Sequence, residues 1–236
     1  MKSRFQLKET VVTIISDAPY IEAARQAIME HRRQLERYIT FDPFFRVTME
    51  PHPMPEERPE IVKRLFLAGN AVGVGPMAAV AGTIAELAVE AALEKGAKHV
   101  IVDNGGDIAL FTDKPVLVGI YAGGSAAKHL AFQVEAHESK GICTSSGRVG
   151  PSISFGNVDA ATVIAKSASL ADAAATALGN TVVGNSKKET ERAFDVIKSV
   201  DGIEGAILIK DDHIGMWGKL PKIVKAPVNP DFITRP

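Results

Sequence analysis

The sequence predicts an α+β fold in which antiparallel or mixed sheets pack against helices. Short β-branched runs alternate with glycine, asparagine and aspartate turns, which is typical of hairpins. Segments with apolar residues at helical spacing lie between these runs, without the regular strand–helix alternation of a parallel sheet. The chain has 236 residues, of which 46% are hydrophobic and 23% charged, so it can build a sizeable core.

Each element follows from a local pattern. Threonine and β-branched residues predict a first strand over Phe5–Ile15. Apolar spacing predicts helices over 20–38, 59–71, 76–95, 170–178 and 187–199. Further strands are expected at His99–Val102, Ile108–Phe111, Val116–Tyr121, Leu130–Glu135, Ala161–Ala165, Ala206–Lys210 and His213–Trp217.

Residues 41–59 carry several prolines and cannot be helical throughout. The aromatic residues Phe41, Phe44 and Phe45 indicate that this segment packs onto the body of the protein. We therefore expect one domain over 1–236. The alternative is an N-terminal subregion, 1–59, joined to the rest by the proline-rich segment.

Composition narrows the function classes. The net charge is −1, so a nucleic-acid or anionic-membrane surface is not expected. One cysteine, Cys143, excludes an internal disulfide and a cysteine-rich zinc module. The N-terminus has no apolar signal region, and no uninterrupted apolar run reaches the roughly 18 residues of a membrane helix. We expect a cytoplasmic protein without membrane insertion.

The run Gly73-Val74-Gly75-Pro76-Met77-Ala78 matches a dinucleotide-binding fingerprint in letters only. That fingerprint requires a preceding strand, and here the preceding residues are predicted as helix. The helix start after Gly75 can still offer free N–H groups to an anion. The simpler interpretation is a turn between helices.

Two polar runs allow a structural and a functional interpretation each. Asn104-Gly105-Gly106-Asp107 is typical of a hairpin turn, but adjacent glycines also let a ligand approach the backbone. Cys143-Thr144-Ser145-Ser146-Gly147-Arg148 can cradle phosphate oxygens or end a strand. Catalysis by Cys143 is disfavoured, because no histidine lies near it in sequence.

Asp172 and Thr176 are four residues apart on a predicted helix, so both side chains lie on one face. A carboxylate and a hydroxyl are hard oxygen donors suited to Mg²⁺ or Ca²⁺. The alternative is that Ser169 caps the helix and Asp172 complements its dipole.

Taken in order, four segments resemble the ApbE-like superfamily, whose best-known members are flavin transferases. They are Gly82-Thr83-Ile84-Ala85-Glu86, Asn104-Gly105-Gly106-Asp107, Thr144-Ser145-Ser146-Gly147, and Ala171-Asp172 through Thr176-Ala177-Leu178. Within the superfamily the chain is most similar to a short branch marked by the run from Gly75 to Gly82. Members of the superfamily usually carry a secretion or lipoprotein signal, which we do not expect for this chain.

The resemblance implies a T-fold-like architecture that binds FAD with Mg²⁺ and transfers FMN to a threonine or serine of a partner flavoprotein, releasing AMP. It implies that Asp172 and Thr176 ligate the metal. The implied cofactor-binding residues are Gly82, Glu86, Asn104, Gly105, Gly106, Asp107, Thr144, Ser145, Ser146, Gly147 and Arg148.

Two departures from the family pattern bear on activity. The family's lysine before the glycine is Ala81 here, and its histidine–aspartate–proline segment is replaced by Val149–Gly156, which has no histidine. Three hypotheses follow. The first is a Mg²⁺-dependent flavin- or nucleotide-binding protein, with flavin transfer as its more specific form. The others are another enzyme of cofactor or sulfur metabolism on this scaffold, and a non-catalytic ligand-binding module. The oligomeric state is not predicted.

Overall fold

The computed structural model describes residues 1–8, 10–120, 130–146, 156–184, 187–211 and 213–226. Its main element is a sheet of eight strands, in which every neighbouring pair is antiparallel. In spatial order the strands are β1 (Lys2–Leu7), β2 (Thr10–Ile15), β3 (Val100–Asn104), β4 (Asp107–Phe111), β7 (Lys140–Ser145), β8 (Ala160–Ala165), β9 (Ile203–Lys210) and β10 (His213–Gly218). This is the predicted α+β class.

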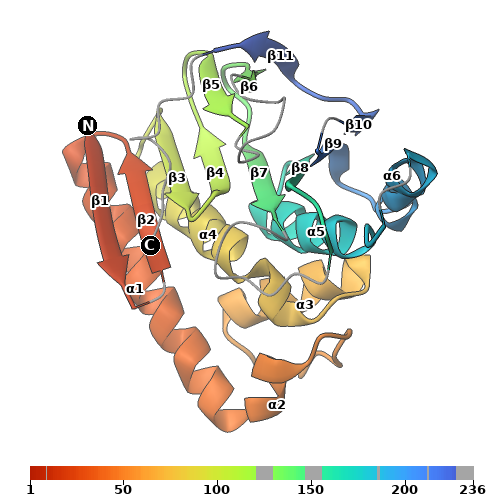
Figure 1. The fold of residues 1–236 in the computed structure, drawn as a ribbon. Helices are drawn as coiled ribbons and strands as arrows, with labels where there is room; N and C mark the ends of the chain where they lie inside the picture. Colours follow the sequence, from red (N-terminus) through yellow and green to blue (C-terminus); the bar gives the residue numbers. More distant parts are fainter. Residues whose placement is uncertain (9, 121–129, 147–155, 185–186, 212, 227–236) are drawn as a thin grey trace.

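Helices cover one face of this sheet (Figure 1). The helical elements are α1 (Ala18–Phe41), α2 (Pro43–Val47), α3 (Glu60–Val72), η1 (Pro76–Ala79), α4 (Val80–Glu94), α5 (Ala168–Asn180), α6 (Lys187–Ala193) and η2 (Phe194–Val196). Alternate strand residues such as Val102, Cys143 and Val163 face them and share one core with α1, α3, α4 and α5.

A second, three-stranded sheet covers the opposite face. It consists of β11 (Lys222–Lys225), β6 (Leu130–Val134) and β5 (Val116–Gly119), all antiparallel, at the top of Figure 1. Phe132 of this sheet packs against Leu110, Ile142 and Ile164, the strand residues that point away from the helices. Thus each central strand is buried on both faces.

Several sequence-based expectations need correction. The single strand expected at Phe5–Ile15 is wrong: β1 and β2 form a hairpin, and Lys8 adopts a positive φ of 54° at its turn. Strand β7 and strand β11 were not predicted. The expected helix over 187–199 ends at Ala193 and continues as the 3-10 turn η2.

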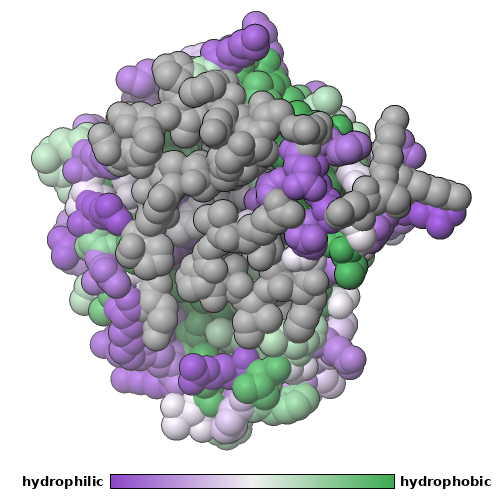
Figure 2. All heavy atoms as spheres, in the orientation of Figure 1, coloured by the Kyte–Doolittle hydropathy of each residue, from purple (hydrophilic) through white to green (hydrophobic). Residues whose placement is uncertain are grey.

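The proline-rich segment contains the short helix α2, and its aromatic residues differ in role. Phe45 is fully buried and meets Phe66 edge-on at a ring separation of 5.1 Å, as expected of a packed segment. Phe41 and Phe44 are 86% and 58% exposed, so the segment packs onto the body through Phe45 and not through these two side chains. Apolar surface accordingly shows at the end of the molecule that carries α2 (Figure 2).

The segment Pro76–Glu94 is long and apolar enough to cross a membrane, judged by length and composition alone. Its apolar residues, among them Ile84, Leu87 and Ala88, are buried in the helix–sheet core. Burial within the protein explains its composition, because a central helix needs no polar face.

Candidate functional site

Helices α4 and α5 approach each other closely where Gly82 faces Asp172. A Cβ at Gly82 would lie 2.7 Å from the Cβ of Asp172, closer than side-chain carbons come, and would also meet the Ala168 carbonyl. Gly141 of β7 gives α5 the same freedom on the sheet side, since a Cβ there would lie 2.9 Å from that of Ala168. Glycine at both positions therefore brings the start of α5 against α4 and the sheet together.

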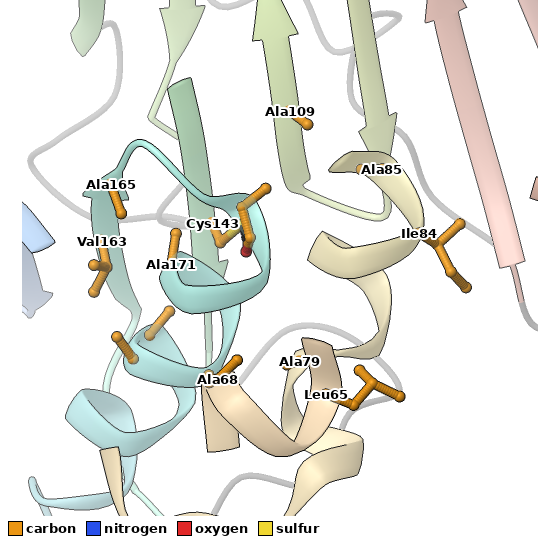
Figure 3. Packing of buried hydrophobic residues seen from close by; sticks show 14 of the residues in the cluster. Leu65, Ala68, Ala79, Ile84, Ala85, Ala109, Cys143, Val163, Ala165 and Ala171 are labelled. Carbon is orange, nitrogen blue, oxygen red and sulfur yellow. Dashed lines mark hydrogen bonds between the residues drawn. The ribbon is translucent and has the colours of Figure 1, made fainter. Parts of the chain in front are cut away.

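The side chains of α5 that face the sheet are small, so the helix axis lies close to the strands. Figure 3 shows Cys143 on β7 beneath the first turns of α5, with Ala171 beside it. The Cys143 thiol donates a hydrogen bond to the Ala168 carbonyl at 3.4 Å. Polar groups carried by α5 or the strands at this level are consequently surrounded by protein.

Asp172 is the central carboxylate of this region. It is 8% exposed, and its Oδ2 accepts a hydrogen bond from the Gly82 amide at 2.8 Å, in the first turn of α4. Burial raises the pKa of Asp172 to about 7, against the opposing effect of the amides of Gly82 and Ala81. The carboxylate thus supplies an acceptor to the start of α4.

Asp107, the first residue of β4, lies on the same face of the sheet. Its Oδ1 accepts a hydrogen bond from the Thr144 amide of β7 at 3.2 Å. The residue keeps some exposed surface at the strand end, yet protein atoms crowd its carboxylate. Burial, and then the nearby charge of Asp172, raise the pKa of Asp107 well above its usual value.

The same environment keeps Cys143 protonated. Burial raises the pKa of its thiol well above the usual range, and the charges of Asp107 and Asp172 add to this effect. A catalytic cysteine needs the opposite, a lowered pKa and access to solvent, whereas Cys143 is fully buried. The expectation against cysteine catalysis agrees with this geometry.

Glu86 of α4 braces the start of α5. Its Oε2 accepts hydrogen bonds from the Ser167 hydroxyl, the Ser169 amide and the Ser169 hydroxyl at 2.9, 2.7 and 2.7 Å. Its Oε1 lies 3.5 Å from an Arg64 nitrogen. Ser167, which accepts from the Leu170 amide, is the cap of α5, so the interpretation of Ser169 as the cap is wrong.

The hairpin between β3 and β4 confirms the turn interpretation of 104–107. Asn104 pairs with Asp107, and Gly105 and Gly106 have φ of 69° and 106°. A Cβ on either glycine would meet nothing within 4 Å, so the backbone borders open space. The Asn104 amide group donates to the Ala81 carbonyl at 3.1 Å, which ties this hairpin to α4.

The hydroxyl run on β7 divides between the two faces of the sheet. Ser145 is buried on the α5 side near Gly179. The Thr144 hydroxyl points to the other face and lies 2.9 Å from the Thr162 hydroxyl, because successive strand residues alternate. Ser146 follows the strand, while Gly147 and Arg148 lie outside the described residues.

Thr176 lies one helical turn after Asp172 on α5 and is half-buried. Among the described residues its hydroxyl has no hydrogen-bond partner, and no group of three or more histidine, cysteine or acidic side chains gathers as a metal cage. Asp172 forms no ion pair with a described lysine, arginine or histidine. An uncompensated carboxylate with a hydroxyl one turn away fits a small divalent cation that keeps part of its water shell.

Solved structures place this architecture among the ApbE proteins. The flavinyl transferase ApbE of Pseudomonas stutzeri, in its apo form, aligns with a TM-score of 0.60 over 94% of this chain and 95% of its own, at 16% identity. The ApbE protein of Thermotoga maritima aligns with a TM-score of 0.53 over 100% and 99%, at 15% identity. The fold is therefore ApbE-like, as the resemblance implied.

A family model described as "AbpE bacteria" matches residues 2–209, and the chain belongs to this family. It is also 56% identical to a UPF0280 protein of Methanosarcina acetivorans, over 100% of this chain and 93% of that protein. A UPF0280 protein of Archaeoglobus fulgidus is 45% identical over 98% of both chains.

Proposed function

We propose that this protein binds FAD, or another flavin or nucleotide with a diphosphate, together with Mg²⁺. The observation that carries the proposal is Asp172: a buried carboxylate, held in place by the Gly82 amide, with no cationic partner among the described residues. Thr176, one turn later, supplies a hydroxyl on the same helix face. Similarity of fold to flavin transferases supports the choice of ligand.

Asp172 and Thr176 would hold the cation in this proposal. Bound Mg²⁺ would neutralise the charge of a diphosphate and activate its leaving phosphate. The open backbone at Gly105 and Gly106 would border the flavin, and Ser145, on the α5 side of β7, would face the diphosphate. The Thr144 hydroxyl is excluded from this role, because it is bonded to Thr162 on the other face.

For Glu86 we propose a role other than the flavin contact that the resemblance implied. Three donors from Ser167 and Ser169 occupy one of its oxygens, and Arg64 lies near the other. We propose that it positions α5, and with it Asp172, while the ligand lies on the far side of the helix start.

Binding of the ligand precedes transfer in this proposal. Transfer of FMN to a flavoprotein acceptor is its finer form, and a non-catalytic binding module is the second candidate. Ala81 favours the second candidate, since it stands where the ApbE-like pattern has a lysine.

The test uses purified protein with FAD and Mg²⁺. FAD binding is measured by quenching of flavin fluorescence, and AMP formation by chromatography. Asp172→Ala should weaken Mg²⁺-dependent binding at least about tenfold, whereas Asp195→Asn, an exposed carboxylate paired with Lys198, should leave it unchanged.

The outcomes separate the candidates. AMP formation that depends on Asp172 establishes cleavage of the FAD diphosphate, the bond that FMN transfer must break; with water as the acceptor the second product is free FMN. Metal-dependent binding of FAD without AMP establishes the binding module. Failure of the wild-type protein to bind FAD and ADP in the presence of Mg²⁺ overturns the proposal.

A further inference from the structure

We propose that Asp107 is a second carboxylate ligand of the cation held by Asp172, so that this cation joins strand β4 to helix α5. This inference rests on the proposed function in one respect, the presence of a divalent cation at Asp172. It assigns to Asp107 a role distinct from lining the flavin.

The two carboxylates flank the same short piece of β7. The Thr144 amide donates to Asp107, and the preceding residue, Cys143, donates to Ala168 in the turn of α5 before Asp172. Backbone amides fix the orientation of both carboxylates: Thr144 donates to Oδ1 of Asp107, and Gly82 donates to Oδ2 of Asp172. A carboxylate has about four lone-pair sites, so each can accept such hydrogen bonds and still coordinate a metal.

Glycine makes this juxtaposition feasible. Gly82 and Gly141 admit α5 to distances at which any side chain would collide with Ala168 or Asp172. A helix held further from the sheet by larger residues would carry Asp172 away from β4. The close approach of the helix therefore serves the carboxylate pair as well as packing.

The pair lacks the positive charge that accompanies other partly buried acids in this protein. Glu90 is paired with Arg64 at 2.7 Å, and Glu204 with Lys140 at 2.7 Å. No described lysine, arginine or histidine forms an ion pair with Asp107 or Asp172. Two neighbouring carboxylates in a low-dielectric site are unfavourable without compensation, which a divalent cation with oxygen ligands provides.

Asp103 provides a matched comparison on the same hairpin. It points to the opposite face of the sheet, and its Oδ1 accepts a hydrogen bond from the Gly106 amide at 2.8 Å. An acid on this hairpin therefore does not suffice for the proposed role. The face that holds Asp172 determines which one takes part.

The experiment measures cation binding without any flavin. Metal-free protein is titrated with Mn²⁺, and free Mn²⁺ is followed by electron paramagnetic resonance, with Mg²⁺ competition to establish a shared site. Asp107→Asn and Asp172→Asn should each weaken Mn²⁺ binding at least about tenfold. Asp103→Asn should stay within about twofold of the wild type, and Asp107→Glu should recover part of the affinity lost in Asp107→Asn.

Circular dichroism of every variant shows whether it is folded. If Asp107→Asn does not fold, Asp107→Glu is compared with the wild type: its longer side chain should weaken Mn²⁺ binding more than about twofold, and unchanged affinity overturns the inference. Mn²⁺ affinity of Asp107→Asn within about twofold of the wild type overturns the inference, as does absence of Mn²⁺ binding by the wild type. Neither result depends on FAD, so failure of the inference is distinguishable from failure of ligand binding in the proposed function.

Discussion

At the scale of single residues, Glu86 and Asp172 show two ways to place a carboxylate inside this protein. Glu86 accepts hydrogen bonds from two serines of the α5 start and lies near Arg64. Asp172 accepts from backbone amides and has no such cation among the described residues. The first arrangement pairs the carboxylate within the protein, and the second is the basis for the proposed cation site.

Replacing Glu86 by glutamine should destabilise the protein by about 1–3 kcal/mol, because an amide leaves some of the donors of Ser167 and Ser169 unsatisfied. Chemical denaturation measures the free energy of unfolding. Glu90→Gln, one turn along α4, is the control and should cost less than about 1 kcal/mol, because the Glu90 side chain is 42% exposed and solvent screens its pair with Arg64. Equal losses in the two variants would contradict the bracing role of Glu86.

Sequence reasoning reached some of these residues and missed the roles of others. Asp172, Asp107 and Asn104 were singled out as candidate site residues, Asp107 and Asn104 because an acid and an amide beside glycines are locally conspicuous, and Asp172 because of its helical spacing to Thr176. The bond between Glu86 and Ser167 spans 81 positions, and no local pattern reveals such a partner. The face of the sheet on which Thr144 lies depends on the exact strand register, because a shift by one residue would move its side chain to the opposite face.

At the scale of elements, the crossing of α4 and α5 depends on the absence of one side chain. Gly82→Ala should lower the free energy of unfolding by about 1–3 kcal/mol, since the new Cβ would meet the backbone of Ala168. Urea denaturation gives the value.

Gly179→Ala, in the last turn of α5, is the matched control. A Cβ there would have its nearest neighbour at 3.4 Å, the Ser145 hydroxyl, close to ordinary contact. This variant should be as stable as the wild type or gain up to about 1 kcal/mol from helix propensity. A Gly82→Ala protein as stable as Gly179→Ala would show that the helices can separate without cost.

The helices and most strands could be predicted because their apolar spacing is local. Strand β7 escaped prediction because its Lys-Gly-Ile-Cys-Thr-Ser sequence carries little strand signal of its own. Its conformation is fixed by β4 and β8, which pair with it on either side. The hairpin within 2–15 escaped for a related reason, since its turn at Lys8 has no glycine to mark it.

At the scale of the whole molecule, His31 links stability to pH. Burial lowers the pKa of His31 below 6.5, while its hydrogen bond to Gln34 opposes this shift; Arg64 of α3 lowers the pKa further, and Glu60 and Glu90 raise it. The unfolded chain therefore binds a proton below pH 6.5 that the folded protein binds less readily. His31 thus lowers stability as the pH falls through this range.

In His31→Gln this contribution should disappear. The free energies of unfolding of wild type and variant are measured in urea from pH 8 to pH 5. Their difference should be constant above about pH 7, and the wild type should then lose stability relative to the variant as the pH falls. Parallel pH profiles for the two proteins would contradict the assignment.

The thiol of Cys143, the single cysteine of the sequence, can report how often α5 separates from the sheet. It lies beneath α5, bonded to Ala168, so a thiol reagent reaches it only when the helix lifts from the strands. The labelling rate of the native protein therefore measures how often the helix opens, at a thiol close enough to Asp107 and Asp172 for both charges to raise its pKa. A cation that bridges β4 and α5 would lower the labelling rate of Cys143. The size of this decrease would measure how strongly the cation stabilises the docked helix, without any signal from a flavin.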